Sequence, residues 1–280
     1  MKKVLVCLAA LAMTTAVFAQ KIDELNPANN SNGGHGMEIK GWQKPGGDAR
    51  PQQNLTYHGG PVIHSAKVVL IFWGTFPSGY TTAIANFRNQ FGMTGEFNTI
   101  TQYSDGSGNI QLTNLASGTA DMFDTSTPPT NVTDSAVQGE VLKYLQTHTF
   151  DNSTIYEVFI PSGSYSSSGN STSCGGPNLS YCAYHGHFSN GGRDIKYSIQ
   201  PWAGCSGCSS FGDTTLDQDH FVCHETREAV TDPDLNAWYD RSGNEADDKC
   251  AWTPSPFIGT GGFGYQYEWS NANSGCVKTR

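Results

Sequence analysis

Val68-Val69-Leu70-Ile71-Phe72-Trp73 is a continuous run of β-branched, aliphatic and aromatic residues in a chain of 280 residues. An unbroken apolar run of this length is typical of a strand that is buried on both faces of a sheet. Two later apolar runs, Ile155–Ile160 and Ile195–Gln200, are expected as further strands, and Pro161 ends the first of them. We expect an edge strand at Ile110–Leu115.

Helical patterns alternate with these runs. Thr81–Phe91 places Ile84, Phe87 and Phe91 at helical spacing. Thr133 and Asp134 are typical of a helix start, and that helix should continue to about Gln146. A third helix is expected over Leu216–Val230, after a Ser- and Gly-rich loop at 162–176. The order of strands and helices predicts an α/β (α+β) fold, in which helices pack on a mixed sheet.

The chain divides into three parts. Residues 1–19, with Lys2, Lys3 and a short apolar stretch, have the pattern of a secretory signal peptide. Residues 20–55 are rich in Asn, Gly, Pro and Gln, and predict a flexible leader or a short pro-segment. We expect one domain over 56–280. The protein should therefore be secreted, to an extracellular or periplasmic location.

The charge excludes two classes of partner. The sequence holds 16 Lys and Arg against 25 Asp and Glu, and removing Lys2 and Lys3 with the signal leaves a net charge of −11. Nucleic acids and anionic membranes are bound by clusters of Lys and Arg. We expect neither as a partner.

Seven cysteines remain once the signal, with Cys7, is removed, and all lie in the second half of the chain. In an oxidising compartment most should pair and pin long loops. Local pairs Cys174–Cys182 and Cys250–Cys276, and a tight Cys205–Cys208 loop, are plausible from spacing. Cys223 lies inside the third expected helix and is the candidate for the free thiol.

The stretch His224-Glu225-Thr226-Arg227-Glu228 contains the candidate metal ligands and the candidate general base. Residues four apart share one face of a helix, so His224 and Glu228 can bind one metal ion while Glu225 flanks it. His-Glu-x-x-His zinc peptidases divide the roles in this way, with two ligands and a glutamate as general base. Here the second ligand is a glutamate, which zinc accepts. The competing interpretation is an ordinary helix whose Glu225 and Arg227 face solvent.

A catalytic zinc site needs a third protein ligand. Pro233 ends the helix, and an acidic loop pinned by Cys250 follows. Asp248 is the first choice for the third ligand, with Asp240 and Asp232 as alternatives; the other interpretation of Asp232 is that it braces the turn. The loop acids also suit an additional calcium ion; they are Asp232, Asp240, Glu245, Asp247 and Asp248.

Other side chains are candidates for supporting roles. His185 or His187 could serve as a ligand or as a hydrogen-bond donor to the transition state, and Tyr239 is a second candidate donor. His220 lies four residues before His224 and could support it or be solvated. The alternative for the two histidines near Cys182 is that they lie in a loop without a role.

Residues 223–233, 237–240 and 248–250 resemble microbial secreted relatives of the plant Exordium (phosphate-induced protein) family. The opening Tyr57-His58-Gly59-Gly60-Pro61 and the segment 182–185 are similar too. The resemblance implies an extracellular or cell-wall protein. Plant members lack the His-Glu-x-x-Glu residues and are growth-related, whereas the microbial kind that keeps them looks like a zinc peptidase.

The sequence therefore predicts a secreted, zincin-like, zinc-dependent metallopeptidase that acts on a protein or peptide substrate. His224, Glu228 and Asp248 would hold the metal, and Glu225 would be the general base for a metal-activated water. The alternative is a non-catalytic, Exordium-like extracellular protein with a role in cell-wall binding or growth, and with a structural metal or none.

Overall fold

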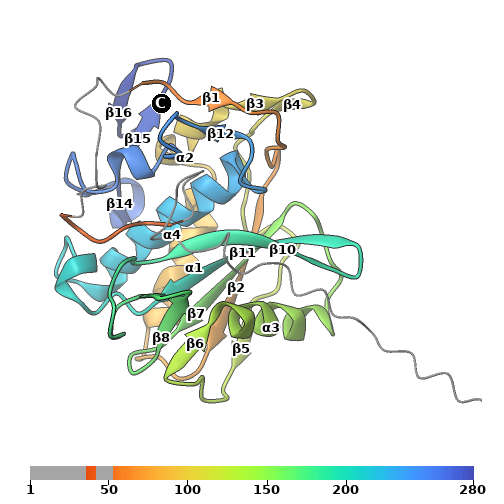
Figure 1. The fold of residues 1–280 in the computed structure, drawn as a ribbon, viewed down its shortest axis with the longest axis vertical. Helices are drawn as coiled ribbons and strands as arrows, with labels where there is room; N and C mark the ends of the chain where they lie inside the picture. Colours follow the sequence, from red (N-terminus) through yellow and green to blue (C-terminus); the bar gives the residue numbers. More distant parts are fainter. Residues whose placement is uncertain (1–35, 42–52) are drawn as a thin grey trace, which may run out of the picture.

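The computed structural model describes residues 36–41 and 53–280. The expected signal peptide, and the leader apart from 36–41 and 53–55, lie outside the described residues. Figure 1 shows a sheet with helix α3 on one side and helices α1 and α4 on the other, and the C-terminal segments packed beyond α4.

The central sheet has five strands in the order β10-β11-β7-β2-β5. Strand β2 (Lys67–Trp73) is parallel to β5 (Met122–Asp124) and to β7 (Thr154–Ile160). Strand β11 (Arg193–Pro201) is parallel to β7, and β10 (Tyr184–Asn190) runs antiparallel to β11 along the edge. The sheet is thus mixed, as predicted.

Alternate residues of β2 pack into two different hydrophobic cores, one on each face of the sheet. Val68, Leu70 and Phe72 lie in one core with side chains of α1 (Tyr80–Phe91) and α4 (Thr214–Thr231). Val69 and Ile71 lie in the other core with Val137, Val141 and Tyr144 of α3 (Asp134–Leu145). Side chains of successive strand residues point to opposite faces, so an unbroken apolar run is what this position requires.

The remaining elements are short. They are helix α2 (Gly95–Asn98), the 3₁₀ helices η3 (Thr99–Gln102), η4 (Ser206–Cys208), η5 (Asp248–Cys250) and η6 (Thr260–Gly262), and strands β1 (Thr56–Tyr57), β3 (Ser104–Asp105), β4 (Gly108–Asn109), β6 (Asn131–Thr133), β8 (Tyr165–Ser168), β9 (Ser171–Thr172), β12 (Trp238–Tyr239), β13 (Phe257–Ile258), β14 (Gly264–Tyr265), β15 (Glu268–Ser270) and β16 (Gly275–Val277).

Helix α4 is enclosed by the rest of the fold. Its N-cap, Asp213, accepts hydrogen bonds from the backbone N–H groups of Thr215 and Leu216, at 2.9 and 3.1 Å. Every residue from Asp217 to Thr231 is buried, because the sheet covers one side and the C-terminal segments cover the other (Figure 1). The interpretation of α4 as a surface helix with solvent-facing Glu225 and Arg227 is therefore wrong.

Two expectations about irregular segments are also wrong. Residues 110–115 form no strand; Ile110 and Leu115 are buried in the core, and the backbone N–H of Val68 donates to the carbonyl of Leu115 at 2.8 Å. Ile110 and Leu112 alternate, but Leu112 is exposed and Leu115 breaks the alternation of a strand. The expected loop at 162–176 contains β8 and β9.

Three disulfides pin the loops. Cys250–Cys276 is the local pair expected, and Cys223 is buried and free as expected. The other pairings were predicted wrongly, because the structure joins Cys174 to Cys205 and Cys182 to Cys208. Cys182 precedes β10 and Cys208 follows β11. Because β10 and β11 are antiparallel neighbours, the start of β10 lies beside the end of β11, and this brings the two cysteines together.

Within the described ranges, no helix is long and apolar enough to cross a membrane.

We expect a digest of the unreduced protein to yield disulfide-linked peptides for Cys174–Cys205, Cys182–Cys208 and Cys250–Cys276 by mass spectrometry. Replacing Cys182 and Cys208 together by Ala should lower the free energy of unfolding by roughly 2–4 kcal/mol, because the unfolded chain loses a cross-link. Denaturant unfolding measures this change. A peptide that links Cys205 to Cys208 would contradict the pairing.

Candidate metal centre

The predicted metal ligands of α4 lie together. The Nε2 atom of His224 is 3.1 Å from Oε2 of Glu228 and 3.6 Å from Oδ1 of Asp248. His224 and Glu228 are fully buried, and the Asp248 side chain is 14% exposed. A tetrahedral zinc ion with bonds of about 2.0–2.1 Å holds its ligand atoms about 3.3 Å apart. The two separations from Nε2 of His224 are thus close to the spacing of a zinc site, and the ligand atoms of all three side chains lie within 4.8 Å of one another.

Gln266, which follows β14, fixes the orientation of the His224 ring by contacting the nitrogen opposite the candidate ligand atom. Oε1 of Gln266 lies 3.1 Å from Nδ1 of His224 and 2.8 Å from Nε2 of His220. Nε2 of Gln266 donates to the carbonyl oxygen and to Oδ1 of Asp247, at 2.9 and 2.8 Å. Exchanging the oxygen and nitrogen of the Gln266 amide would therefore break both hydrogen bonds. Because Oε1 of Gln266 is an acceptor, Nδ1 of His224 carries a proton and donates to it. Nε2 of His224 is then the nitrogen that can bind a metal.

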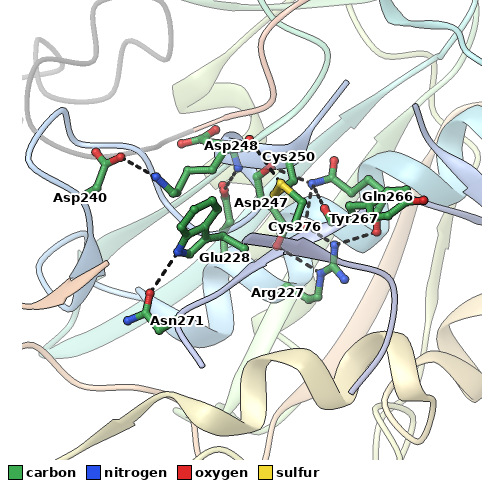
Figure 2. The surroundings of a disulfide bond; sticks show 12 residues. Arg227, Glu228, Asp240, Asp247, Asp248, Cys250, Gln266, Tyr267, Asn271 and Cys276 are labelled. Carbon is green, nitrogen blue, oxygen red and sulfur yellow. Dashed lines mark hydrogen bonds and ion pairs between the residues drawn. A yellow bond between two sulfur atoms is a disulfide. The ribbon is translucent and has the colours of Figure 1, made fainter. Parts of the chain in front are cut away.

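Asp248 reaches the centre through contacts of its own loop. Its backbone N–H donates to Oε1 of Glu228 at 3.0 Å, and its Oδ2 accepts from the N–H of Glu245 at 3.0 Å. Figure 2 shows Glu228 and Asp248 beside the disulfide of Cys250, which holds this loop.

Buried polar atoms without hydrogen bonds mark the centre. Nε2 of His185 and both carboxylate oxygens of Glu245 have no hydrogen-bond partner, and Nε2 of His224 and Oε2 of Glu228 lie 3.1 Å apart with no hydrogen-bond partner outside the centre. Buried polar atoms are almost always satisfied, and each exception costs free energy. Atoms of the kinds that bind metals, unsatisfied and converging in one buried place, fit a cation.

The surrounding carboxyl groups also favour a positive charge at the centre. Burial lowers the pKa of His224, but Glu228 and Asp248 outweigh burial and raise this pKa well above its usual value. Burial and the neighbouring Asp248 raise the pKa of Glu228. Burial, followed by repulsion from Glu228, likewise raises the pKa of Glu245.

Glu225 lies next to the centre on α4. Oε2 of Glu225 is 3.3 Å from Nδ1 of His185, and Oε1 accepts from the backbone N–H of Met37 at 3.2 Å. Burial raises the pKa of Glu225 to about 8. Burial, with the neighbouring His224, lowers the pKa of His185 to about 3, which keeps its imidazole neutral.

The structure places the predicted histidines on a strand. His185 and His187 both belong to β10, two residues apart on one face. His185 is fully buried against Glu225, Glu228 and Glu245. His187 lies farther along the strand and pairs with Asp194 at 2.8 Å, with its side chain 34% exposed.

Three other predicted residues are engaged elsewhere. Asp240 accepts from Nζ of Lys249 at 2.9 Å. Asp232 braces the turn after α4, where Oδ1 accepts from the N–H groups of Asn236 and Ala237, both at 2.6 Å. The ring of Tyr239 stacks on His58 with centroids 3.7 Å apart. The groups of potential metal ligands found among the described residues include none of these three.

Sequence reasoning missed several contributors. Glu245 was expected only as a calcium ligand, yet with His185 and Glu228 it forms a second group of potential ligands. Gln266 and Met37 were not predicted at all, because they are 42 and 188 residues from the atoms that they contact. A third group, formed by His187, Asp194 and Asp234, is bridged by Lys196.

Comparisons of this chain with protein families, with curated proteins and with solved structures find no match.

The hydrogen bond from His224 to Gln266 yields a test. We expect Gln266→Ala to weaken zinc affinity by about 10–100-fold, because a ligand histidine loses the group that orients it. Competition with a chromophoric chelator measures the affinity. The matched control is Gln111→Ala, which removes an exposed glutamine. Equal affinities for the variant, the control and the wild type would show that Gln266 does not support the metal.

Proposed function

We propose that this protein is a secreted, zinc-dependent metallopeptidase with a zincin-like metal helix. The observation that carries the proposal is the convergence of Nε2 of His224, Oε2 of Glu228 and Oδ1 of Asp248, of which the first two are buried and have no hydrogen-bond partner outside this group. A catalytic zinc site typically has three protein ligands, of nitrogen and oxygen types, and one open position.

The roles of the residues follow from their positions. His224, Glu228 and Asp248 would hold the ion, which when bound supplies the positive charge that polarises a carbonyl and acidifies water. Glu225 accepts a proton from the water that attacks the scissile carbonyl, since it immediately follows His224 on α4. His185 donates to Glu225 and fixes the direction of its carboxylate.

Secretion is supported by the three disulfides, because disulfides persist in oxidising compartments. The negative net charge of the chain argues against nucleic acid or an anionic membrane as the substrate. The resemblance to microbial Exordium relatives that keep His-Glu-x-x-Glu points to a protein or peptide substrate.

One observation favours a second candidate function. His224, Glu225 and Glu228 are fully buried, and a catalytic site must admit its substrate. A buried ion that only stabilises the fold would suit a non-catalytic extracellular protein of the Exordium kind.

Glu225→Gln separates the two candidates. We expect the wild-type protein to contain zinc and to cleave a general protein substrate such as casein. The variant should keep its zinc, because Glu225 is not a ligand, and should lose cleavage by about 10²–10⁴-fold, the usual contribution of a general base.

Metal content is measured by plasma mass spectrometry and cleavage by release of labelled peptides. The matched control is Glu96→Gln, a buried carboxyl that accepts from the N–H of Thr260 at 2.9 Å, outside the centre. Zinc in a protein that cleaves nothing would favour the structural metal. Absence of bound zinc would exclude the peptidase.

A further inference from the structure

The second group of potential ligands adjoins the first and shares Glu228 with it. Nε2 of His185 lies 3.8 Å from Oε2 of Glu245, and Nδ1 of His185 lies 3.8 Å from Oε2 of Glu228. All three side chains are fully buried. Nε2 of His185 and Oε2 of Glu245 are thus slightly farther apart than the ligand atoms of tetrahedral zinc, which lie about 3.3 Å apart. His185, Glu228 and Glu245 each offer one ligand atom, and these atoms lie within 4.8 Å of one another.

Two features show that the second group is more than a cluster of acids. Nε2 of His185 and both carboxylate oxygens of Glu245 have no hydrogen-bond partner although they are buried. The opposite nitrogen of His185, Nδ1, faces Oε2 of Glu225 at 3.3 Å. Histidines that bind metals commonly donate their other N–H to a carboxylate in this way.

We propose that the centre holds two divalent metal ions, with Glu228 as the bridging ligand, the first ion on His224 and Asp248 and the second on His185 and Glu245. The proposal rests on the metal site of the proposed function and extends it. Two ions bridged by one carboxylate lie about 3.5–4 Å apart, and together they can orient and polarise a substrate and its attacking water.

Metal counting tests the proposal on the full secreted chain. We expect two zinc ions per chain after loading with zinc and removal of the excess, as measured by plasma mass spectrometry. Glu245→Gln should hold one ion, and so should His185→Asn, which guards against a folding defect peculiar to one variant. The control Glu96→Gln should hold two. Thermal unfolding verifies that each variant is folded.

Each outcome is decisive. One ion in the wild type, retained by Glu245→Gln and lost by His224→Ala, would overturn the second site and leave the proposed function intact. Two ions in Glu245→Gln would overturn the assigned ligands. Absence of metal from the wild type would overturn both the second site and the proposed function. In the cobalt-loaded protein, two ions without magnetic coupling would overturn the carboxylate bridge.

A different observation supports a second inference, concerning residues 36–41. Met37 is fully buried, and its N–H donates to Oε1 of Glu225 at 3.2 Å, while its carbonyl accepts from the N–H of Cys182 at 2.7 Å. Glu38 forms an antiparallel bridge with Tyr181. Leader residues thus lie, through one isolated antiparallel bridge, against the segment that precedes β10, and Met37 contacts the proposed general base.

We infer that residues 36–41 are an autoinhibitory pro-segment, which occupies the place where an extended peptide substrate would bind. Peptides commonly bind by adding a strand to an exposed backbone edge. A segment that holds this edge and the carboxylate of Glu225 excludes substrate from both. This inference also rests on the proposed function.

Gly36 offers the test. A Cβ atom there would lie 2.6 Å from both the carbonyl oxygen of Ala183 and Cβ of Tyr184, so Gly36→Val must displace the segment. We expect EDTA to remove zinc about tenfold faster from the full-chain variant, because local opening becomes easier, and we expect peptide cleavage to rise. Met37→Pro, which removes the N–H donor, should act likewise.

Lys40→Ala, which changes an exposed side chain of the same segment, is the control and should match the wild type. Unchanged zinc release in both Gly36→Val and Met37→Pro would overturn the pro-segment. Faster release without any cleavage would overturn the inhibitory role and the peptidase together. Faster release with cleavage at the wild-type rate would overturn the inhibitory role alone.

Discussion

The buried guanidinium of Arg227 joins helix α4 to the C-terminal segments of the chain. It forms ion pairs with Asp247 and with Glu268, the latter at 3.0 Å from Nε, and it donates to the carbonyl of Glu96 at 3.1 Å. Figure 2 shows Arg227 beside Asp247 and Gln266, close to the Cys250–Cys276 disulfide. Removing one partner of a buried ion pair typically costs about 3–5 kcal/mol, so α4 and these segments are bound into one structure.

The ion pairs of Arg227 act on carboxylates at the outside of the centre. Arg227 compensates Asp247 and Glu268, and Lys249 compensates Asp240 while packing over the ring of Trp269 at 4.3 Å. These two cations are therefore committed to the outer carboxylates. The inner carboxylates lie against His185 and His224 and accept only backbone N–H groups besides, from Met37 to Glu225 and from Asp248 to Glu228.

Much of the fold followed from local sequence patterns. The apolar run of β2, the cap at Thr133 and the spacing of His224 and Glu228 each depend on residues within one element, where the periodicity of strands and helices is decisive. Asp248 was also identified as the first choice, because Pro233 turns the chain and Cys250 anchors the loop that returns toward α4.

The contributors that were missed depend on contacts between distant segments. Nothing near Gln266 in sequence marks it as the partner of His224, and Glu245 is one of several similar acids in its loop. The disulfides were mispredicted because spacing favours near neighbours, whereas the antiparallel pairing of β10 and β11 brings Cys182 to Cys208. Tertiary packing, which local patterns do not encode, determined all of these.

Cys223 shows how the same packing protects the chain chemically. An odd cysteine in an oxidising environment can attack existing disulfides or link two molecules, but only as an exposed thiolate. Cys223 is fully buried in α4, and burial raises its pKa to about 12. Once the helix is packed, this thiol is withdrawn from exchange, so the three disulfides stay in their native pairing and the folded molecules do not become cross-linked to one another.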